Sequence, residues 1–216
     1  MDKTVSGETM YFSEAFYGWN FDILNGDEIG KILYGEYKIL KFLGKGSKSK
    51  VVLVEKIKTK EKFVAKIMLK KNLEEFLINE YEVLNELNHS GIIKVHEYKK
   101  DNEIEPSCLI MEYFDSKNLK ELYYEENYEQ VKILDIFLKL AYSLKYLHDK
   151  LYVHWDIKPE NILVDADNNV KLIDFGLSYK AYNNKKAMGT LKYMSPERID
   201  GEKTDLRSDI YSYFLS

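Results

Sequence analysis

The chain has 216 residues, enough for one domain or for one domain divided into two lobes. It is 45% hydrophobic and 31% charged, which is typical of a globular protein with a substantial core, and its net charge of −4 argues against a nucleic-acid partner. The single cysteine, Cys108, excludes an internal disulfide and favours a reducing intracellular compartment, the cytoplasm. No apolar run is long enough for a signal peptide or a membrane span, so we expect no membrane partner.

Residues 1–36 are expected to form an N-terminal extension. The segment is rich in glycine but also holds a cluster of aromatic residues between Tyr11 and Phe21, more than a disordered tail usually has. The simpler interpretation is a tail with one patch packed on the domain. The alternative is a docking motif.

From Tyr37 the pattern predicts a sheet and one helix. Five segments rich in β-branched and aromatic residues are typical of strands. They span residues 37–44, 50–56, 63–69, 92–98 and 108–113. Between the third and fourth segments, apolar residues recur at helical spacing from Leu73 to Leu87, and Glu80 is the one charged member of that stripe.

The rest of the chain is mainly helical in pattern. Apolar spacing predicts a long amphipathic helix from about Leu134 to His148, followed by two short strands. Strands first and helices later predict an α+β fold with a sheet lobe, residues 37–113, and a helical lobe, residues 114–216.

The turn between the first two strands reads G-K-G-S-K-S. Gly44 and Gly46 would let the backbone approach a phosphate closely, although an ordinary hairpin with two glycines fits equally well. Lys66 lies between apolar neighbours on the third strand and is expected to point into a partly enclosed site. Glu80 is its natural partner, because an unpaired buried carboxylate is costly. An exposed strand lysine is the alternative.

Residues 153–161 read V-H-W-D-I-K-P-E-N, and D-F-G follows at residues 174–176. Asp156 is suited to accept a proton from a hydroxyl, and Lys158 to neutralise a phosphoryl group during transfer. Asn161, like the aspartate of D-F-G, offers the kind of oxygen that Mg²⁺ prefers. A polar turn is the alternative for each piece, but the order of the pieces makes chance a poor explanation.

These motifs resemble those of the eukaryotic-type protein kinases, and Gly189-Thr190 together with Lys158 resembles the serine/threonine class. The resemblance covers residues 37–216. It implies a two-lobed kinase fold, with an antiparallel sheet lobe carrying one helix and a mainly helical second lobe, incomplete because the chain stops at Ser216. It also implies ATP and Mg²⁺ as cofactors and a protein substrate phosphorylated on serine or threonine.

The resemblance assigns roles residue by residue. Four residues would be catalytic: Lys66, Glu80, Asp156 and Lys158. Asn161 and Asp174 would hold the metal ion. The nucleotide would contact Leu43, Gly44, Gly46, Ser49, Val51, Ala65, Lys66, Met111, Glu112, Phe114 and Leu163. Asp209 would anchor the backbone of the catalytic loop from a helix below it.

Trp155 departs from the family pattern, which has an arginine there that clasps a phosphate on the activation segment. Tryptophan makes no bidentate phosphate contact, and the segment, residues 174–197, contains no arginine. We therefore predict that phosphorylation of this segment does not control activity. The alternative is that Trp155 packs against the segment, and both can hold.

Two further expectations concern the end of the chain and its activity. Apolar residues crowd the last eleven positions, from Leu206 onward, so we expect marginal stability, self-association or a partner that binds this face. Packing of the aromatic residues of the N-terminal extension over this face is a less favoured alternative. The predicted function is ATP-dependent phosphoryl transfer to serine or threonine hydroxyls of proteins. The alternative is a non-catalytic, ATP-binding or scaffolding remnant of a kinase, a pseudokinase.

Overall fold

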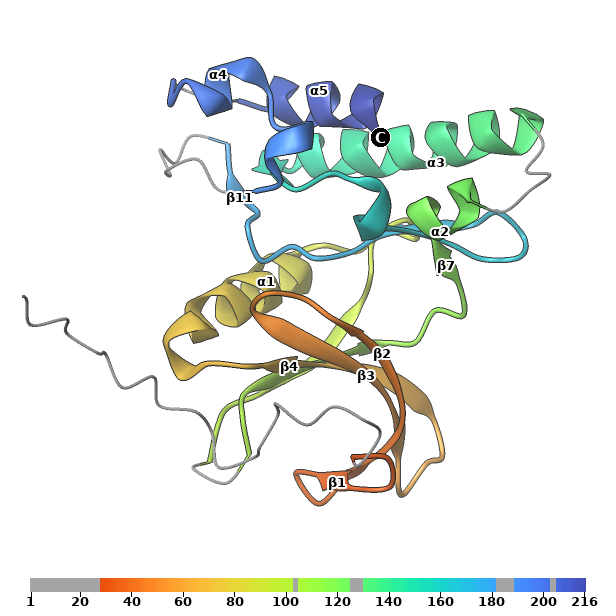
Figure 1. Ribbon diagram of the computed structural model, residues 1–216, viewed down its shortest axis with the longest axis vertical. Helices are drawn as coiled ribbons and strands as arrows, with labels where there is room; N and C mark the ends of the chain where they lie inside the picture. The colour runs from red at the N-terminus through yellow and green to blue at the C-terminus, as the bar shows by residue number, and fades with distance from the viewer. Residues whose placement is uncertain (1–27, 103–104, 125–129, 182–188, 203–204) are drawn as a thin grey trace, which may run out of the picture.

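The computed structural model describes residues 28–102, 105–124, 130–181, 189–202 and 205–216. It divides into a sheet lobe and a mainly helical lobe, as the sequence predicts (Figure 1). Within the described parts of the chain, no helix combines the length and apolarity needed to cross a bilayer.

The sheet lobe holds a six-stranded antiparallel sheet with the order β1-β2-β3-β4-β6-β5. Its strands are β1 (Ile32–Leu33), β2 (Tyr37–Lys45), β3 (Ser49–Lys56), β4 (Lys62–Met68), β5 (Val95–Lys99) and β6 (Cys108–Glu112). The β2–β3 pairing shifts register twice, the second time between Phe42 and Gly44. Such irregularities bend a strand, and here they lie just before the glycine turn.

The two faces of the sheet bury different partners because successive strand residues point to opposite sides. One face packs Val52, Ala65 and Ile110 with Leu33 of β1. Glu28 pairs with the buried Lys50 beside it. Residues 28–36, which the sequence analysis assigned to the extension, therefore contribute a strand and a buried ion pair to this lobe.

The other face of the sheet packs against α1 (Glu74–Glu86), which follows a 3-10 turn at Lys71–Leu73. Leu77 and Leu84 of α1 are buried with Met68 and Met111. Figure 1 shows α1 between the sheet and the helical lobe. Glu80 is also buried on this face of α1, which carries its carboxylate toward the junction of the lobes.

The helical lobe is built on α3 (Gln130–Asp149), whose apolar stripe is buried against two short strands. Its other helices are α2 (Leu119–Tyr123), α4 (Pro196–Ile199) and α5 (Arg207–Leu215), with 3-10 turns at Pro159–Asn161 and Leu191–Tyr193. The short strands are β7 (Lys117–Asn118), β8 (Tyr152–Val153), β9 (Ile162–Val164), β10 (Val170–Leu172) and β11 (Tyr179–Lys180).

The core is continuous across the junction of the lobes. Leu77 and Leu84 from α1 belong to the same buried cluster as Leu172 and Phe175 from the helical lobe. Ile92 forms a parallel bridge with Leu172, so part of the predicted strand at 92–98 joins the helical lobe instead, and β5 begins only at Val95. This shared core fixes how the two lobes face each other.

Candidate active site

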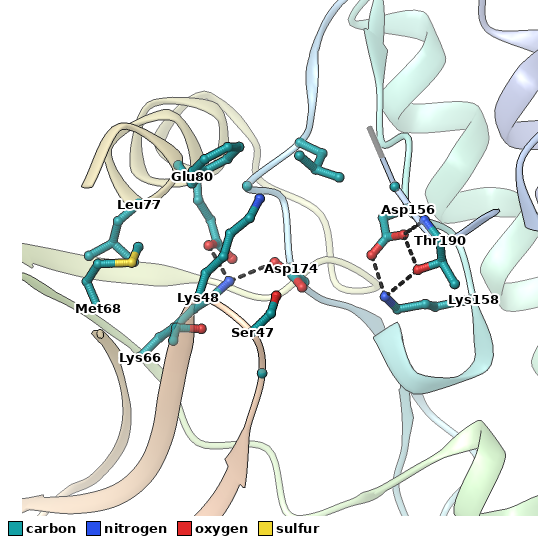
Figure 2. Close-up of a pocket in the computed structure, with 16 residues that line it drawn as sticks. Ser47, Lys48, Lys66, Met68, Leu77, Glu80, Asp156, Lys158, Asp174 and Thr190 are labelled. Atoms are coloured by element: carbon teal, nitrogen blue, oxygen red, sulfur yellow. Dashed lines mark hydrogen bonds and ion pairs between the residues drawn. The ribbon is translucent and has the colours of Figure 1, made fainter. Parts of the chain in front are cut away.

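A cavity of about 480 Å³ lies between the two lobes (Figure 2). This volume is within the range of about 300–1,000 Å³ that is usual for small-molecule sites. Its walls come from the β2–β3 turn, β4, α1, the loop after β8 and the segment after β10. The lining includes Gly46, Ser49, Lys66, Glu80, Asp156, Lys158, Asp174 and Thr190.

Lys66 on β4 joins two carboxylates at one end of this cavity. Its Nζ lies 2.5 Å from Oε2 of Glu80 and 2.7 Å from Oδ1 of Asp174. The ion pair predicted between Lys66 and Glu80 is thus present. The backbone N–H of Phe175 also donates to Glu80, at 3.2 Å, and so ties α1 to the turn that carries Asp174.

Charge outweighs burial in setting the protonation of Lys66 and Asp174, whereas burial raises the pKa of Glu80 above its ordinary value despite the charge of Lys66. Burial alone lowers the pKa of Lys66, but the two carboxylates raise it above its ordinary value. For Asp174 burial raises the pKa, while the charge and hydrogen bond of Lys66 lower it to about 2. At neutral pH the cavity therefore presents an ammonium beside an ionised carboxylate, and the Asp174 side chain is 44% exposed.

Asp156 lies across the cavity in a dense set of hydrogen bonds. Its Oδ1 accepts from the hydroxyl of Thr190 at 2.8 Å and from the Thr190 N–H at 3.0 Å. Its Oδ2 accepts from Lys158 Nζ at 2.6 Å and from Asn161 Nδ2 at 3.1 Å. Burial raises the pKa of Asp156, but the hydrogen bond and charge of Lys158 outweigh it and the pKa is lowered, so this carboxylate is ionised at neutral pH.

The loop that carries Asp156 is held by Asp209 on α5. The carboxylate of Asp209 accepts from the backbone N–H groups of His154, at 2.7 Å, and Trp155, at 2.9 Å. The predicted anchoring role of Asp209 is therefore confirmed. On the other side, the N–H of Ile173 donates to the carbonyl of Asn161 at 3.0 Å, which links this loop to the strand leading to Asp174.

Comparison with known proteins agrees with this arrangement. The family model described as protein kinase domain matches residues 37–215. The chain belongs to the protein kinase domain family. It is 34% identical over 209 residues to a probable serine/threonine-protein kinase KIN1 homolog of Enterocytozoon bieneusi, covering 93% of this chain and 34% of the relative.

Two further relatives are also named as kinases. An Aurora kinase of Patiria pectinifera is 32% identical over 217 residues, covering 98% of this chain and 49% of the relative. Calcium-dependent protein kinase 5 of Plasmodium berghei is 37% identical over 216 residues, covering 94% of this chain and 36% of the relative. The chain thus spans between about a third and a half of the length of these kinases.

The structure brings only part of the predicted nucleotide site to the cavity. Gly46, Ser49 and Lys66 line it; the other predicted contacts lie on surrounding elements and are not among its lining residues. These others are Leu43, Gly44, Val51, Ala65, Met111, Glu112, Phe114 and Leu163. Of the two predicted metal ligands, Asp174 lines the cavity. Asn161 is not among the lining residues, but its amide nitrogen donates to Asp156, which is.

Ala65 faces away from the kinase cleft. Its side chain is 0% exposed and belongs to the buried cluster that includes Leu33 of β1. Val64, in contrast, packs with Met111 on the other face of the sheet. In the antiparallel register Val51 is opposite Lys66 and Met111 is opposite Val64, so these four share one face. The alternation of side chains puts Val64, rather than its neighbour Ala65, beside Lys66.

Lys48 is a cavity residue that the sequence did not single out. Its Nζ lies 3.2 Å from the centroid of the Phe76 ring on α1, and Figure 2 shows it reaching into the same cavity as Lys66. Burial lowers the pKa of Lys48, opposed by the charge of Asp174. A lysine among other lysines in a turn carries no sequence signal for this contact.

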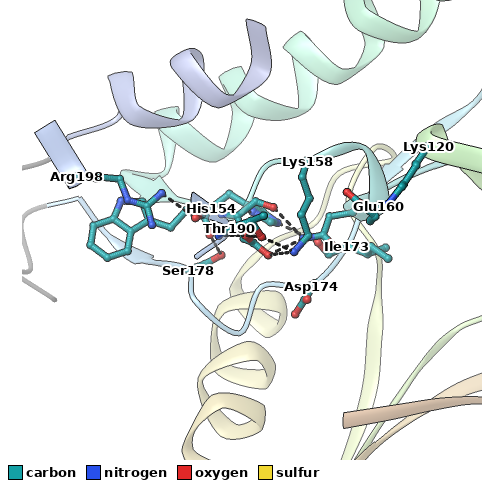
Figure 3. A network of polar contacts seen from close by, with 12 residues as sticks. Lys120, His154, Lys158, Glu160, Ile173, Asp174, Ser178, Thr190 and Arg198 are labelled. Carbon is teal, nitrogen blue, oxygen red and sulfur yellow. Dashed lines mark hydrogen bonds and ion pairs between the residues drawn. The ribbon is translucent and has the colours of Figure 1, made fainter. Parts of the chain in front are cut away.

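Trp155 packs between the activation segment and α4, so the packing interpretation is confirmed. Its ring meets Tyr179 edge-on, with centroids 4.4 Å apart and planes at 88°. Arg198, the residue after the segment, places its guanidinium carbon 4.2 Å from the ring centroid (Figure 3). No motif in the sequence marks Arg198 for this contact.

Proposed function

We propose that this cavity binds Mg-ATP and that the chain transfers the γ-phosphoryl group to a serine or threonine hydroxyl of a protein. The observation that carries the proposal is the convergence of Lys66, Asp156, Lys158 and Asp174 on one cavity. One of the relatives above is named a probable serine/threonine-protein kinase, which supports the choice of substrate.

In this proposal the phosphates enter beside the glycine turn. The turn from Gly46 to Ser49 lines the cavity and would cover the phosphates, and Lys66 adds a cation at the same end. Lys48 would add a second. The adenine would lie farther along the sheet face that Val51, Val64 and Met111 share. Val64 therefore takes the place of Ala65 among the proposed nucleotide contacts.

The residues present also fit a magnesium ion. Mg²⁺ is usually held by one or two carboxylates together with substrate phosphates. Asp174 is ionised and partly exposed, and the amide of Asn161 donates through its nitrogen to Asp156, which leaves its oxygen as a ligand. Asp174 and Asn161 would hold the ion, which would neutralise charge on the phosphates.

Asp156 would orient the substrate hydroxyl and receive its proton. Its Oδ1 already accepts a hydrogen bond from an alcohol, that of Thr190, which supports this role. The substrate oxygen would form a bond to the γ-phosphorus while the bond from that phosphorus to the β–γ bridging oxygen breaks, releasing ADP. Lys158 is placed to neutralise charge on the group in transfer, so catalysis would rest mainly on positioning and electrostatics.

A non-catalytic nucleotide-binding protein is the second candidate. Asp156→Asn separates the two, because it removes the proton acceptor and leaves the phosphate end of the cavity unchanged. We expect the variant to bind Mg-ATP as the wild type does and to lose phosphotransfer to a mixture of serine and threonine peptides. No transfer by a wild type that binds Mg-ATP would favour the second candidate, and equal transfer by both proteins would show that Asp156 is not the proton acceptor.

We further propose that the isolated chain self-associates through α5. Ile210, Tyr211, Phe214 and Leu215 are exposed on this helix, and Phe214 is 79% exposed. Exposed apolar patches commonly mark association sites. Sedimentation velocity should detect a concentration-dependent dimer or larger species that Phe214→Ser weakens. A monomer at all concentrations would contradict the proposal.

A further inference from the structure

The side chain of Trp155 contacts residues at both ends of the activation segment. Tyr179, on β11 near the start of the segment, meets the ring edge-on. Arg198, directly after the segment, stacks its guanidinium on the ring. Trp155 and Arg198 are each 2% exposed, so both contacts are shielded from water. A single side chain thus joins the two ends of the segment to the catalytic loop.

Arg198 also holds the backbone of that loop. Its Nη1 donates to the carbonyl oxygen of Trp155 at 2.8 Å. That carbonyl belongs to the peptide group whose N–H is that of Asp156, and this N–H donates to Nδ1 of His154 at 3.2 Å. The peptide plane that precedes Asp156 is therefore fixed from both sides, which sets the direction in which the Asp156 side chain leaves the backbone.

The backbone of Trp155 needs such support. Its φ is +66°, in the left-handed region that a bulky residue rarely adopts. Asp209 holds its N–H and Arg198 its carbonyl, so both peptide groups around this strained residue are tied. Strained backbone of this kind persists where surrounding contacts over-determine it and is common at active sites.

Arg198 also restricts the space for a side chain at the residue before Thr190. Gly189 has φ +137°, and a Cβ there would lie 2.9 Å from Arg198 Nη2 and 3.0 Å from the Trp155 carbonyl oxygen. Only glycine fits between the guanidinium and the loop. The next residue, Thr190, is the one that bonds Asp156. Arg198 therefore touches both chain segments that determine the surroundings of the Asp156 carboxylate.

We propose that Arg198 is a positioning residue whose stack on Trp155 holds the activation segment and Asp156 in the catalytic arrangement without a phosphate on the segment. This deepens the proposed kinase function and rests on it. A planar guanidinium stacks on an indole and at the same time donates to a carbonyl in its own plane, which an ammonium does not do. In the family pattern, an arginine at the position of Trp155 binds a phosphate on the segment. Here a contact between a permanent cation, Arg198, and the aromatic ring of Trp155 takes its place.

The first test compares Arg198→Met and Arg198→Lys with Arg207→Met, the matched change at the only other arginine, which is exposed. All are measured on the dephosphorylated 216-residue chain. We expect Arg198→Met to lower kcat about 30-fold, equivalent to about 2 kcal/mol, with KM for ATP changed by no more than about twofold. Arg198→Lys should recover only a small part of kcat, and Arg207→Met should match the wild type. Full recovery by lysine, or unchanged kcat in Arg198→Met, would overturn the proposal.

The second test needs no activity and therefore stands if the proposed phosphotransfer fails. Trp19 and Trp155 are the only tryptophans, so Trp19→Phe leaves Trp155 as the single reporter. In that background Arg198→Met should shift the emission of Trp155 to longer wavelength and increase its quenching by acrylamide, while Arg207→Met should change neither. An unchanged spectrum in Arg198→Met at an unchanged melting temperature would show that the stack does not hold Trp155 in place.

Discussion

Lys66 and Arg198 are both largely buried cations close to the candidate active site, but their surroundings differ. Lys66 is 12% exposed and binds two carboxylates, one of which, Asp174, is partly open to the cavity. Arg198 is 2% exposed, stacks on an indole and donates to a backbone carbonyl. The first arrangement can exchange partners with an entering ligand, whereas the second is closed to solvent.

This difference suggests two tasks for the two cations. Charges that face a cavity can be redistributed when phosphates and a metal ion arrive, because carboxylate and phosphate compete for the same ammonium. A stacked ring and a carbonyl fix geometry but offer no ionic site to a ligand. We therefore expect changes at Lys66 to affect chemistry and nucleotide together, and changes around Arg198 to affect chemistry with little effect on nucleotide binding.

The largest effect is expected from Lys66→Met. It removes the cation proposed to hold the phosphates and leaves Glu80 and Asp174 without their common partner. If this raises the barrier by about 2.7 kcal/mol, phosphotransfer falls about 100-fold, and we expect at least that loss. Lys62→Met, at an exposed lysine on the same strand, is the matched control and should keep full activity. Equal turnover in the wild type and Lys66→Met, with contaminating kinases excluded, would remove Lys66 from the site.

Trp155→Arg restores the arginine that the family has at this position, yet we expect it to harm this protein. It would put a second guanidinium against that of Arg198 and remove the ring, and an uncompensated buried charge costs about 3 kcal/mol or more. The variant should melt at a clearly lower temperature than the wild type. Adding Arg198→Met should recover part of the loss. A single variant as stable as the wild type would show that the site accepts two cations and that the stack matters little.

Lys48→Met should act on the nucleotide rather than on the chemical step. If Lys48 moves from the Phe76 ring to the phosphates, its loss removes about 1 kcal/mol of binding, and KM for ATP should rise about fivefold with kcat nearly unchanged. Lys45→Met, in the same turn but exposed, is the control. An effect on kcat alone would place Lys48 with the positioning residues instead.

The smallest effect is a pH dependence from Asp174. Because its pKa in the folded state, about 2, is below the ordinary value of 3.8, its charge stabilises the fold above about pH 4, and this contribution is lost as the pH falls toward 2. After allowance for solvent screening of a side chain that is 44% exposed, we expect about 1 kcal/mol. The difference in unfolding free energy between the wild type and Asp174→Asn should be constant from pH 7 to 5 and shrink below 4; a difference that stays constant to pH 2 would contradict the assignment.

Periodicity and spacing predicted the parts of the fold that repeat a simple rule. Alternating strands, the apolar stripe of α1 and the charged Glu80 within it gave the sheet, the helix and the ion pair to Lys66. The same rule of alternation, applied to the strand of Lys66, would have favoured Val64 over Ala65 as its neighbour in the cleft. The family motif alone does not say which side of the strand a residue faces, and here Ala65 lies on the opposite face from Lys66.

Other features depend on contacts that no local pattern encodes. Arg198 and Trp155 are 43 residues apart and bind through a ring and a carbonyl, neither of which is marked in sequence as a partner for arginine. Ile92 has the composition of a strand residue, but tertiary packing pairs it with β10 instead. Likewise Glu28 is an ordinary charged residue in sequence, and only the fold shows that it pairs with a buried lysine.

The most direct test of the account is a single-turnover measurement on fully dephosphorylated protein, with mass spectrometry confirming that residues 174–197 carry no phosphate. Mg-ATP labelled at the γ-position is mixed with excess enzyme and a serine or threonine peptide, and Asp156→Asn is run in parallel. We predict label on the peptide from the first turnover with the wild type and none with the variant. A wild type that transfers no label until its own activation segment becomes phosphorylated would contradict the account.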